Sequence, residues 1–158
     1  MQGFWQLIRV GPLVAVLFSM VAAAVIGGEP PIAWSAVVHA VVGTALLIVG
    51  AAAMNQRLES RSDARMKRTS QRPLPAGSLT VGQVTSIGML SSAIGIVYLV
   101  AFVGPAAAAT AGLSWMIYVL VYTPLKCVTA WQTPVGAVAG AMPILIGTAA
   151  VGSLLSPI

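Results

Sequence analysis

Three oxygen-bearing side chains recur at every fourth position in the middle of this chain: Asn55, Glu59 and Asp63. On an α-helix this spacing places them on one stripe, each about 6 Å further along the axis. One amide and two carboxylates suit a hard cation such as Mg²⁺, which binds one or two carboxylates and completes its shell with water and substrate phosphate oxygens. The pattern therefore predicts a Mg²⁺-assisted diphosphate site in which these three residues are the metal ligands and the catalytic residues.

Basic side chains flank this stripe in two groups. Arg57, Arg61 and Arg65 repeat with the same spacing but are offset by two residues, which rotates them about 200° to the opposite side of the helix. The second group lies on the expected helix end and loop, where it can neutralise and orient phosphate oxygens. It consists of Lys67, Arg68 and Arg72. The alternative interpretation is a solvated basic loop that sets topology and contacts anionic lipid, although such a loop needs no carboxylates.

The rest of the chain is almost free of charge. Of its 158 residues, 58% are hydrophobic and 7% are charged, whereas soluble domains carry about 25% charged residues. This composition excludes a soluble domain and indicates an integral membrane protein. The net charge of +5 follows from basic loops at a membrane surface, so we expect no nucleic-acid partner. The single cysteine, Cys127, rules out an intramolecular disulfide, and we assign it no role.

Five segments are long and apolar enough to cross a bilayer, which takes about 20 residues per helix. They are residues 10–27, 34–54, 80–103, 106–123 and 134–155. Glycine and proline between them end helices or form turns. The predicted fold class is therefore all-α, a polytopic transmembrane bundle of about five spans.

Alternating the spans across the membrane separates the charges. Arg9, the segment 55–79 and Lys126 fall on one side, whereas Glu29 and the Gly104-Pro105 turn fall on the other. Because Lys and Arg collect in cytoplasmic loops, the N-terminus and the charged loop are predicted to be cytoplasmic. The segment 55–79 would then be a cytoplasmic catalytic segment within one transmembrane domain covering residues 1–158.

One ionisable residue, His39, lies inside an expected span. Such a residue is a functional candidate by default. The interpretation that we favour is a neutral histidine that is hydrogen-bonded to backbone or to a hydroxyl on a neighbouring helix.

The charged segment also resembles a known family. The pattern Asn55-Gln56-x-x-Glu59-x-x-x-Asp63 is similar to the first aspartate-rich motif of the UbiA superfamily of intramembrane prenyltransferases. A second block, Tyr122-Thr123-Pro124-Leu125-Lys126, follows at the expected place. Together they resemble the protohaem IX farnesyltransferase branch of that superfamily.

The resemblance implies a helical bundle with a central cavity that is open toward lipid. The substrates that it implies are farnesyl diphosphate and haem b. Mg²⁺ would bridge aspartate-rich motifs and the diphosphate, and the farnesyl group would pass to a vinyl group of protohaem IX, giving haem O in a bacterial inner membrane. By position, Asn55, Glu59 and Asp63 would be metal and diphosphate ligands. The phosphate contacts would be Arg68, Arg72 and Lys126.

The family has about nine helices and a second Asp-x-x-x-Asp motif, whereas this chain has no acidic residue after Asp63. We therefore expect the sequence to represent the N-terminal half of such a fold, incomplete at its C-terminus and dependent on a missing half or a partner subunit. The alternatives are a related prenyltransferase with a quinone-precursor or chlorin acceptor, and an inactive or split half-enzyme that acts as a non-catalytic membrane subunit.

Overall fold

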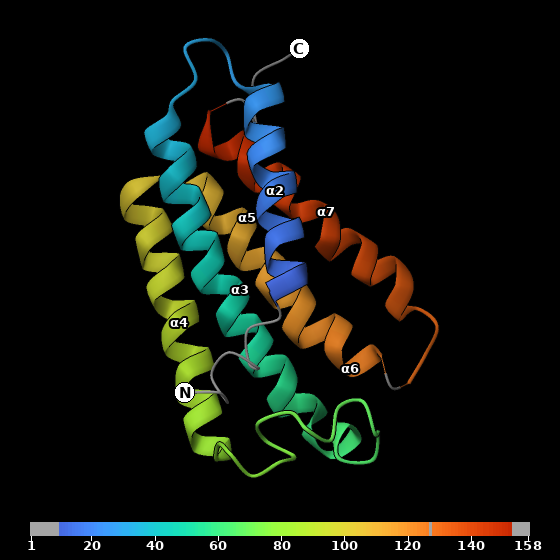
Figure 1. Cartoon of the computed structure of the whole chain (residues 1–158). Helices are drawn as coiled ribbons and strands as arrows, with labels where there is room; N and C mark the ends of the chain where they lie inside the picture. The colour runs from blue at the N-terminus through green and yellow to red at the C-terminus, as the bar shows by residue number, and fades with distance from the viewer. Residues whose placement is uncertain (1–9, 127, 153–158) are drawn as a thin grey trace.

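The computed structural model describes residues 10–126 and 128–152, which form a helical bundle (Figure 1). Its elements are α2 (Val10–Gly27), α3 (Trp34–Asp63), α4 (Val81–Phe102), α5 (Pro105–Met116), the π-helix η1 (Ile117–Tyr122), α6 (Thr123–Leu125) and α7 (Gln132–Ala150). No strand occurs in these two ranges. The prediction of an all-α fold is confirmed.

Five stretches are long and apolar enough to span a membrane: α2, α3, α4, the continuous run Pro105–Leu125, and α7. This agrees with the five predicted spans. The second is longer than predicted, because α3 continues to Asp63 and carries both an apolar part and the charged stripe on one helix. Arg9, Cys127 and the end of the last predicted span lie outside the described residues.

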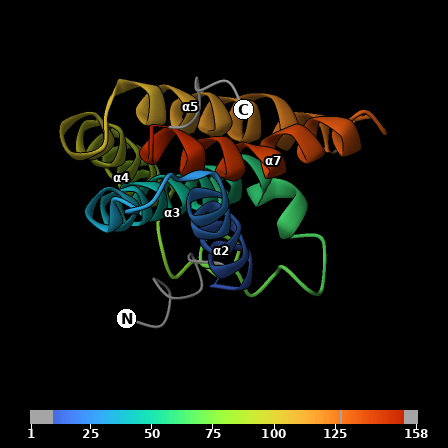
Figure 2. The same ribbon diagram turned by 90° about the horizontal axis from the view of Figure 1, so that it is seen from above.

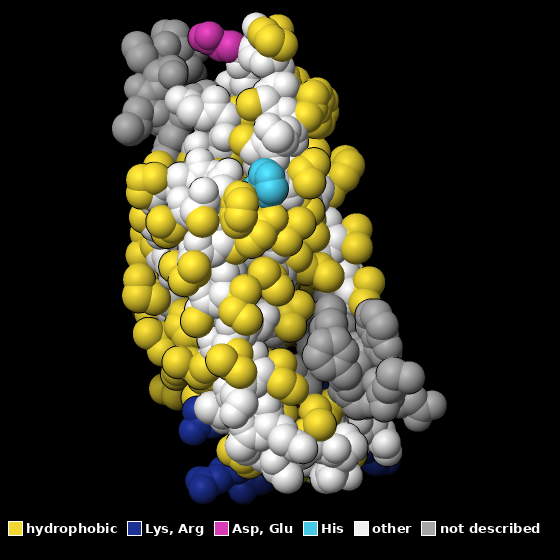
Figure 3. Space-filling view, turned by 90° about the vertical axis from the view of Figure 1, so that its left-hand side faces the viewer, with side chains coloured by type: hydrophobic (Ala, Val, Ile, Leu, Met, Phe, Trp, Pro, Cys, Tyr) yellow, Lys and Arg dark blue, Asp and Glu magenta, His cyan; other side chains and the backbone are white. Residues whose placement is uncertain are grey.

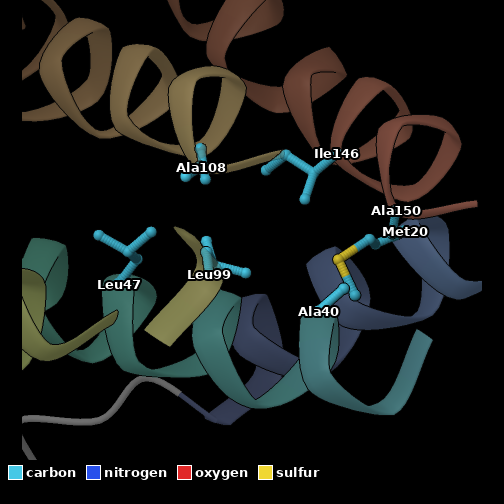
Figure 4. Close-up of a cluster of buried hydrophobic side chains, with 8 residues drawn as sticks. Met20, Ala40, Leu47, Leu99, Ala108, Ile146 and Ala150 are labelled. Carbon is cyan, nitrogen blue, oxygen red and sulfur yellow. The ribbon is translucent and has the colours of Figure 1, made fainter. Parts of the chain in front are cut away.

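Apolar side chains cover the outside of the bundle. In Figure 3, hydrophobic side chains spread over the middle of the visible face, and Lys and Arg side chains gather at one end. Inside the bundle, Met20, Leu47, Leu99 and Ile146 belong to one buried cluster, and Figure 4 shows these side chains meeting from facing helices. A surface of this kind is suited to lipid, with one end adapted to a polar interface.

Helix α3 is the central element. It contacts α2, α4, α5 and α7, and Figure 2 shows α5 and α7 on one side of α3 and α2, with α4 at one edge. A change in the position of α3 would therefore be felt by every long helix of the bundle.

The contact between α3 and α4 depends on glycine. A Cβ atom added at Gly95 would lie 3.0 Å from the carbonyl oxygen of Gly43, and one added at Gly50 would overlap the Ser92 hydroxyl and lie 2.8 Å from the Gly88 carbonyl oxygen. Close backbone approach replaces the hydrophobic effect as the force between helices in lipid. The two helices thus hold each other at a fixed depth and rotation.

We predict that Gly50→Ala lowers the thermal unfolding temperature in detergent micelles, followed by circular dichroism. The added methyl group must displace Ser92 or the α4 backbone, and such overpacking costs about 1–3 kcal/mol. The matched control is Gly82→Ala in the first turn of α4, where the nearest atom is 3.9 Å away and alanine should be neutral or stabilise by about 0.5–1 kcal/mol. Equal unfolding temperatures for the two variants would contradict this packing argument.

Candidate active site

The last turns of α3 carry the predicted stripe, and it faces inward. Asn55, Glu59 and Asp63 are 2%, 6% and 1% exposed. The three arginines of the offset group are exposed, as their rotation about the helix predicts: Arg57, Arg61 and Arg65. Acidic and basic side chains of this helix are therefore on separate faces, and the acidic face lies inside the protein.

Two cations from other segments neutralise the buried carboxylates. Lys126 Nζ lies 3.0 Å from Glu59 Oε1, and Arg72 Nη1 lies 3.4 Å from Glu59 Oε2. The same Arg72 nitrogen donates a hydrogen bond of 2.5 Å to Asp63 Oδ2. A carboxylate removed from water is costly unless it has such partners, so these pairs compensate the burial of Glu59 and Asp63.

The loop after α3 folds back to bring Arg72 to the site. The Thr69 hydroxyl donates a 3.0 Å hydrogen bond to the carbonyl oxygen of Asp63, and Pro73 is fully buried. Leu74 and Leu79 then pack against a small buried cluster of α3 and α4. Arg72 is thereby held between two anchored points.

Lys126 is positioned by the irregular helix that precedes it. Pro124 has no N–H to donate to the preceding turn, and the run changes from α5 through the π-helix η1 into α6. Thr123, next to this proline, donates to Asn55 Oδ1 at 2.9 Å, and Asn55 Nδ2 donates to Glu59 Oε2 at 3.0 Å. The end of this helix is therefore fastened to the stripe by a hydrogen-bond chain as well as by the lysine.

A cavity of about 590 Å³ opens beside this polar cluster, a size typical of a small-molecule site. Its lining comes from α2, α3, α5, η1 and α7, with Lys126 in its wall. Two lining groups have no hydrogen-bond partner within the described ranges, the Thr44 hydroxyl and the Trp115 indole nitrogen. Most of the wall is apolar: Val16, Leu47, Ile48, Ala51, Ala111, Ala139, Pro143 and Ile146 are among its residues. The space therefore suits a hydrocarbon chain with its charged head at the stripe.

The oxygen set fits a hard divalent cation that is shared with a phosphate. It offers two carboxylates and one amide, the ligand types that Mg²⁺ accepts. No group of three or more His, Cys, Asp or Glu side chains arranged for a metal exists in the part of the chain that the structure describes. Protein atoms thus supply part of a coordination shell, and substrate oxygens and water would supply the rest.

The structure gathers five of the seven predicted site residues: Asn55, Glu59, Asp63, Arg72 and Lys126. Lys67 and Arg68 are exposed on the loop, and their proposed phosphate contacts stay predictions. Thr123 belongs to the Tyr122-Thr123-Pro124-Leu125-Lys126 block, and the sequence pattern alone assigns it no role. A threonine beside a proline within an apolar span was the signal for it.

The histidine outside the site agrees with its predicted environment. His39 Nδ1 lies 2.8 Å from the Tyr98 hydroxyl on the neighbouring helix α4. Its ring also stacks on Phe102 at a centroid distance of 5.0 Å. The expected hydrogen bond to a hydroxyl across helices is confirmed.

Comparison with known proteins identifies a family and several relatives. Residues 15–158 match the UbiA prenyltransferase family. The protoheme IX farnesyltransferase of Rhodopirellula baltica is 39% identical over 141 residues, which cover 89% of this chain and 49% of the relative. That of Solibacter usitatus is 42% identical over 71% of this chain and 38% of the relative. The mitochondrial protein of Arabidopsis thaliana is 32% identical over 97% of this chain and 36% of the relative.

These matches cover only part of each relative's length. The chain spans about half the length, or less, of the curated relatives that it matches, and no solved structure matches it. Since the family match covers nearly the whole chain, and its helices carry the inward-facing stripe, the chain belongs to the UbiA prenyltransferase family.

Proposed function

We propose that this chain provides a diphosphate-binding half-site of a Mg²⁺-dependent enzyme that transfers the farnesyl group of farnesyl diphosphate to a vinyl group of protohaem IX (haem b), giving haem O. One observation carries this proposal. A buried stripe of two carboxylates and an amide meets two cations at the edge of a largely apolar cavity. The names of the relatives, protoheme IX farnesyltransferases, support the choice of prenyl donor and acceptor.

In this proposal the charged residues stabilise the leaving diphosphate, and the apolar wall excludes water. In farnesyl transfer, the bond between the allylic carbon and the diphosphate oxygen breaks, and its electron pair leaves with the diphosphate. The allylic carbon bonds to the terminal carbon of the vinyl group, and water adds at the other vinyl carbon with loss of a proton, which gives the hydroxyl group of haem O. Arg72 and Lys126 are placed to neutralise that leaving group, and the exposed Lys67 and Arg68 would contact it from the loop. Mg²⁺, when bound by Asn55, Glu59 and Asp63, supplies further positive charge there. The apolar wall keeps water away from the allylic cation.

The arrangement of the cluster gives the two cations a second task. In the structure they pair with Glu59 and Asp63, so each of the two buried carboxylates has a cationic partner. Each cation has donors to spare, since a guanidinium carries five N–H groups and an ammonium three. They can therefore hold a carboxylate and a phosphate oxygen together.

We also propose a location and an orientation for the chain. The basic side chains gather at one end of the bundle (Figure 3), and the positive-inside rule assigns that end to the cytoplasm. The segment 55–79 would then be the cytoplasmic catalytic segment of a protein in a bacterial inner membrane, within one domain of residues 1–158. Its partners would be the two substrates and membrane lipid.

A second set of ligands is part of this proposal. The matched relatives are about twice as long, and the sequence has no carboxylate after Asp63. We propose that a further segment or a partner subunit faces the stripe across the diphosphate. Mixing the purified chain with the second half of a relative tests this idea, because farnesyl transfer should appear only in the mixture.

We predict that Asp63→Asn weakens Mg²⁺-dependent binding of a non-hydrolysable farnesyl diphosphate analogue at least tenfold, about 1.4 kcal/mol. The change keeps the size of the side chain but removes a charged oxygen ligand and partner of Arg72. Isothermal titration calorimetry on the chain in nanodiscs, with Mg²⁺ or with chelator, measures the affinity. The control is Glu29→Gln, which changes an exposed carboxylate in the loop between α2 and α3. This variant should bind the analogue as wild type does. If the affinity for the analogue is unchanged by Asp63→Asn and by removal of Mg²⁺, the proposed site is wrong.

The cavity is tested separately with Gly140→Phe. Gly140 lines the cavity, and an added Cβ would meet nothing within 4 Å, so the ring can enter the empty space without disturbing the helices. Binding of the farnesyl analogue should fall at least tenfold, while binding of Mg²⁺ with inorganic pyrophosphate should stay unchanged. Val138→Phe, at an exposed position of the same helix, is the control. Unaltered analogue binding by Gly140→Phe would show that the hydrocarbon tail lies elsewhere.

A further inference from the structure

We infer that Thr123 is a positioning residue that allows the side-chain amide of Asn55 to turn over when a divalent cation binds, an inference that rests on the proposed function. The Thr123 hydroxyl oxygen lies 2.9 Å from Asn55 Oδ1 and 2.8 Å from the carbonyl oxygen of Tyr118. A hydroxyl has one proton and two lone pairs. It can therefore donate to only one of these two acceptors at a time.

The amide of Asn55 has a defined orientation in the structure. Asn55 directs its nitrogen to Glu59 Oε2 at 3.0 Å and its oxygen to Thr123. An amide nitrogen donates two hydrogen bonds and has no lone pair for a metal, whereas Mg²⁺ is bound by oxygen. A cation held by Glu59 therefore needs Asn55 to present its oxygen on that side.

Turning the amide by half a rotation exchanges its two ends. The oxygen then faces a carboxylate oxygen of Glu59, and these two acceptors would be favourable together if Asn55 and Glu59 held a divalent cation. The nitrogen then faces Thr123, which must become an acceptor. Thr123 can do so because its own proton can go to the Tyr118 carbonyl oxygen, 2.8 Å away.

Burial makes this hydroxyl necessary. Asn55 and Thr123 are each 2% exposed, so bulk water cannot take the place of a lost partner, and a buried polar group without a partner costs about 1–3 kcal/mol. Thr123 satisfies the amide in both orientations, as donor in one and as acceptor in the other. A valine of the same shape leaves the amide oxygen unpaired in the first orientation and the amide nitrogen unpaired in the second. Because an orphaned N–H group is tolerated less well than an orphaned carbonyl oxygen, valine disfavours the turned orientation.

The π-helix supplies the second acceptor. The backbone N–H of Thr123 also bonds to the Tyr118 carbonyl oxygen, five residues earlier, and a carbonyl oxygen has two lone pairs. The wide turn of η1 thus gives Thr123 a place to send its proton. π-helical turns are often found at functional sites, and here the turn has a definite chemical use.

The turnover is observable in the wild-type chain by NMR, because Asn55 is the only asparagine in the sequence. Labelling with ¹⁵N-asparagine gives one side-chain amide signal from the protein in nanodiscs. On addition of Mg²⁺ with inorganic pyrophosphate, we expect a new nuclear Overhauser contact between these amide protons and the Thr123 methyl group. Binding that leaves the amide protons beside Glu59, without this contact, would overturn the inference.

Variants test the role of the hydroxyl, with Mn²⁺ and pyrophosphate as the probe and electron paramagnetic resonance as the readout. Thr123→Val should weaken Mn²⁺ binding at least tenfold, and Thr123→Ser should stay within about threefold of wild type. In an Asn55→Ala background, Thr123→Val should have no further effect. Thr110→Val is the matched control, because that hydroxyl bonds only within its own helix, to the Ala106 carbonyl oxygen, at an exposed position.

The outcomes separate this inference from the proposed function. If Mn²⁺ binding depends on Glu59 and Asp63 but is equal in wild type and Thr123→Val, the turnover fails and the metal site stands. Equal losses in the Ser and Val variants, or a loss that persists without Asn55, would assign Thr123 to packing and overturn the inference. Mn²⁺ binding that ignores Glu59 and Asp63 as well would remove the proposed function itself.

Discussion

The charged end of this protein depends on pairing two buried carboxylates with cations. Glu59 and Asp63 are almost fully buried, and an isolated carboxylate at such a place would be protonated or would prevent folding. Arg72 and Lys126 remove that cost by ion pairs from two different segments. The fold-back of the loop after α3 and the docking of the helix that ends at Leu125 are therefore coupled to the same pair of side chains.

This electrostatic constraint is matched by a steric one. Helix α3 carries the stripe at one end and glycine contacts to α4 along its length. In lipid, helices gain little from burying apolar surface against one another, and they associate through close packing and hydrogen bonds. One such bond joins the Ser91 hydroxyl to the Leu46 carbonyl oxygen across the two helices. The rigid pair of helices holds the carboxylates where they meet Arg72 and Lys126.

A prenyl donor combines a highly charged head with a hydrocarbon tail, and the cavity has the same division. Lys126 is the charged residue in its wall, and the α3 residues that line it are mostly small or aliphatic. Thr44 lies three turns before Asn55, about 16 Å along the helix axis. Its hydroxyl group and the indole nitrogen of Trp115 add polar groups to the cavity wall.

Much of this could be predicted from the sequence. The spans follow from hydropathy, because backbone groups in lipid must be satisfied within a helix, and the inward stripe follows from the period of 3.6 residues. Where Lys126 and Arg72 would lie, which loop cations would remain exposed, and the hydrogen bond from Thr123 to Asn55 were decided by tertiary structure. Glu59 and Lys126 are 67 positions apart in the chain, so no local pattern links them. Their meeting depends on how α3 packs with the helix that ends at Leu125, and that packing arises from the shapes of many side chains together.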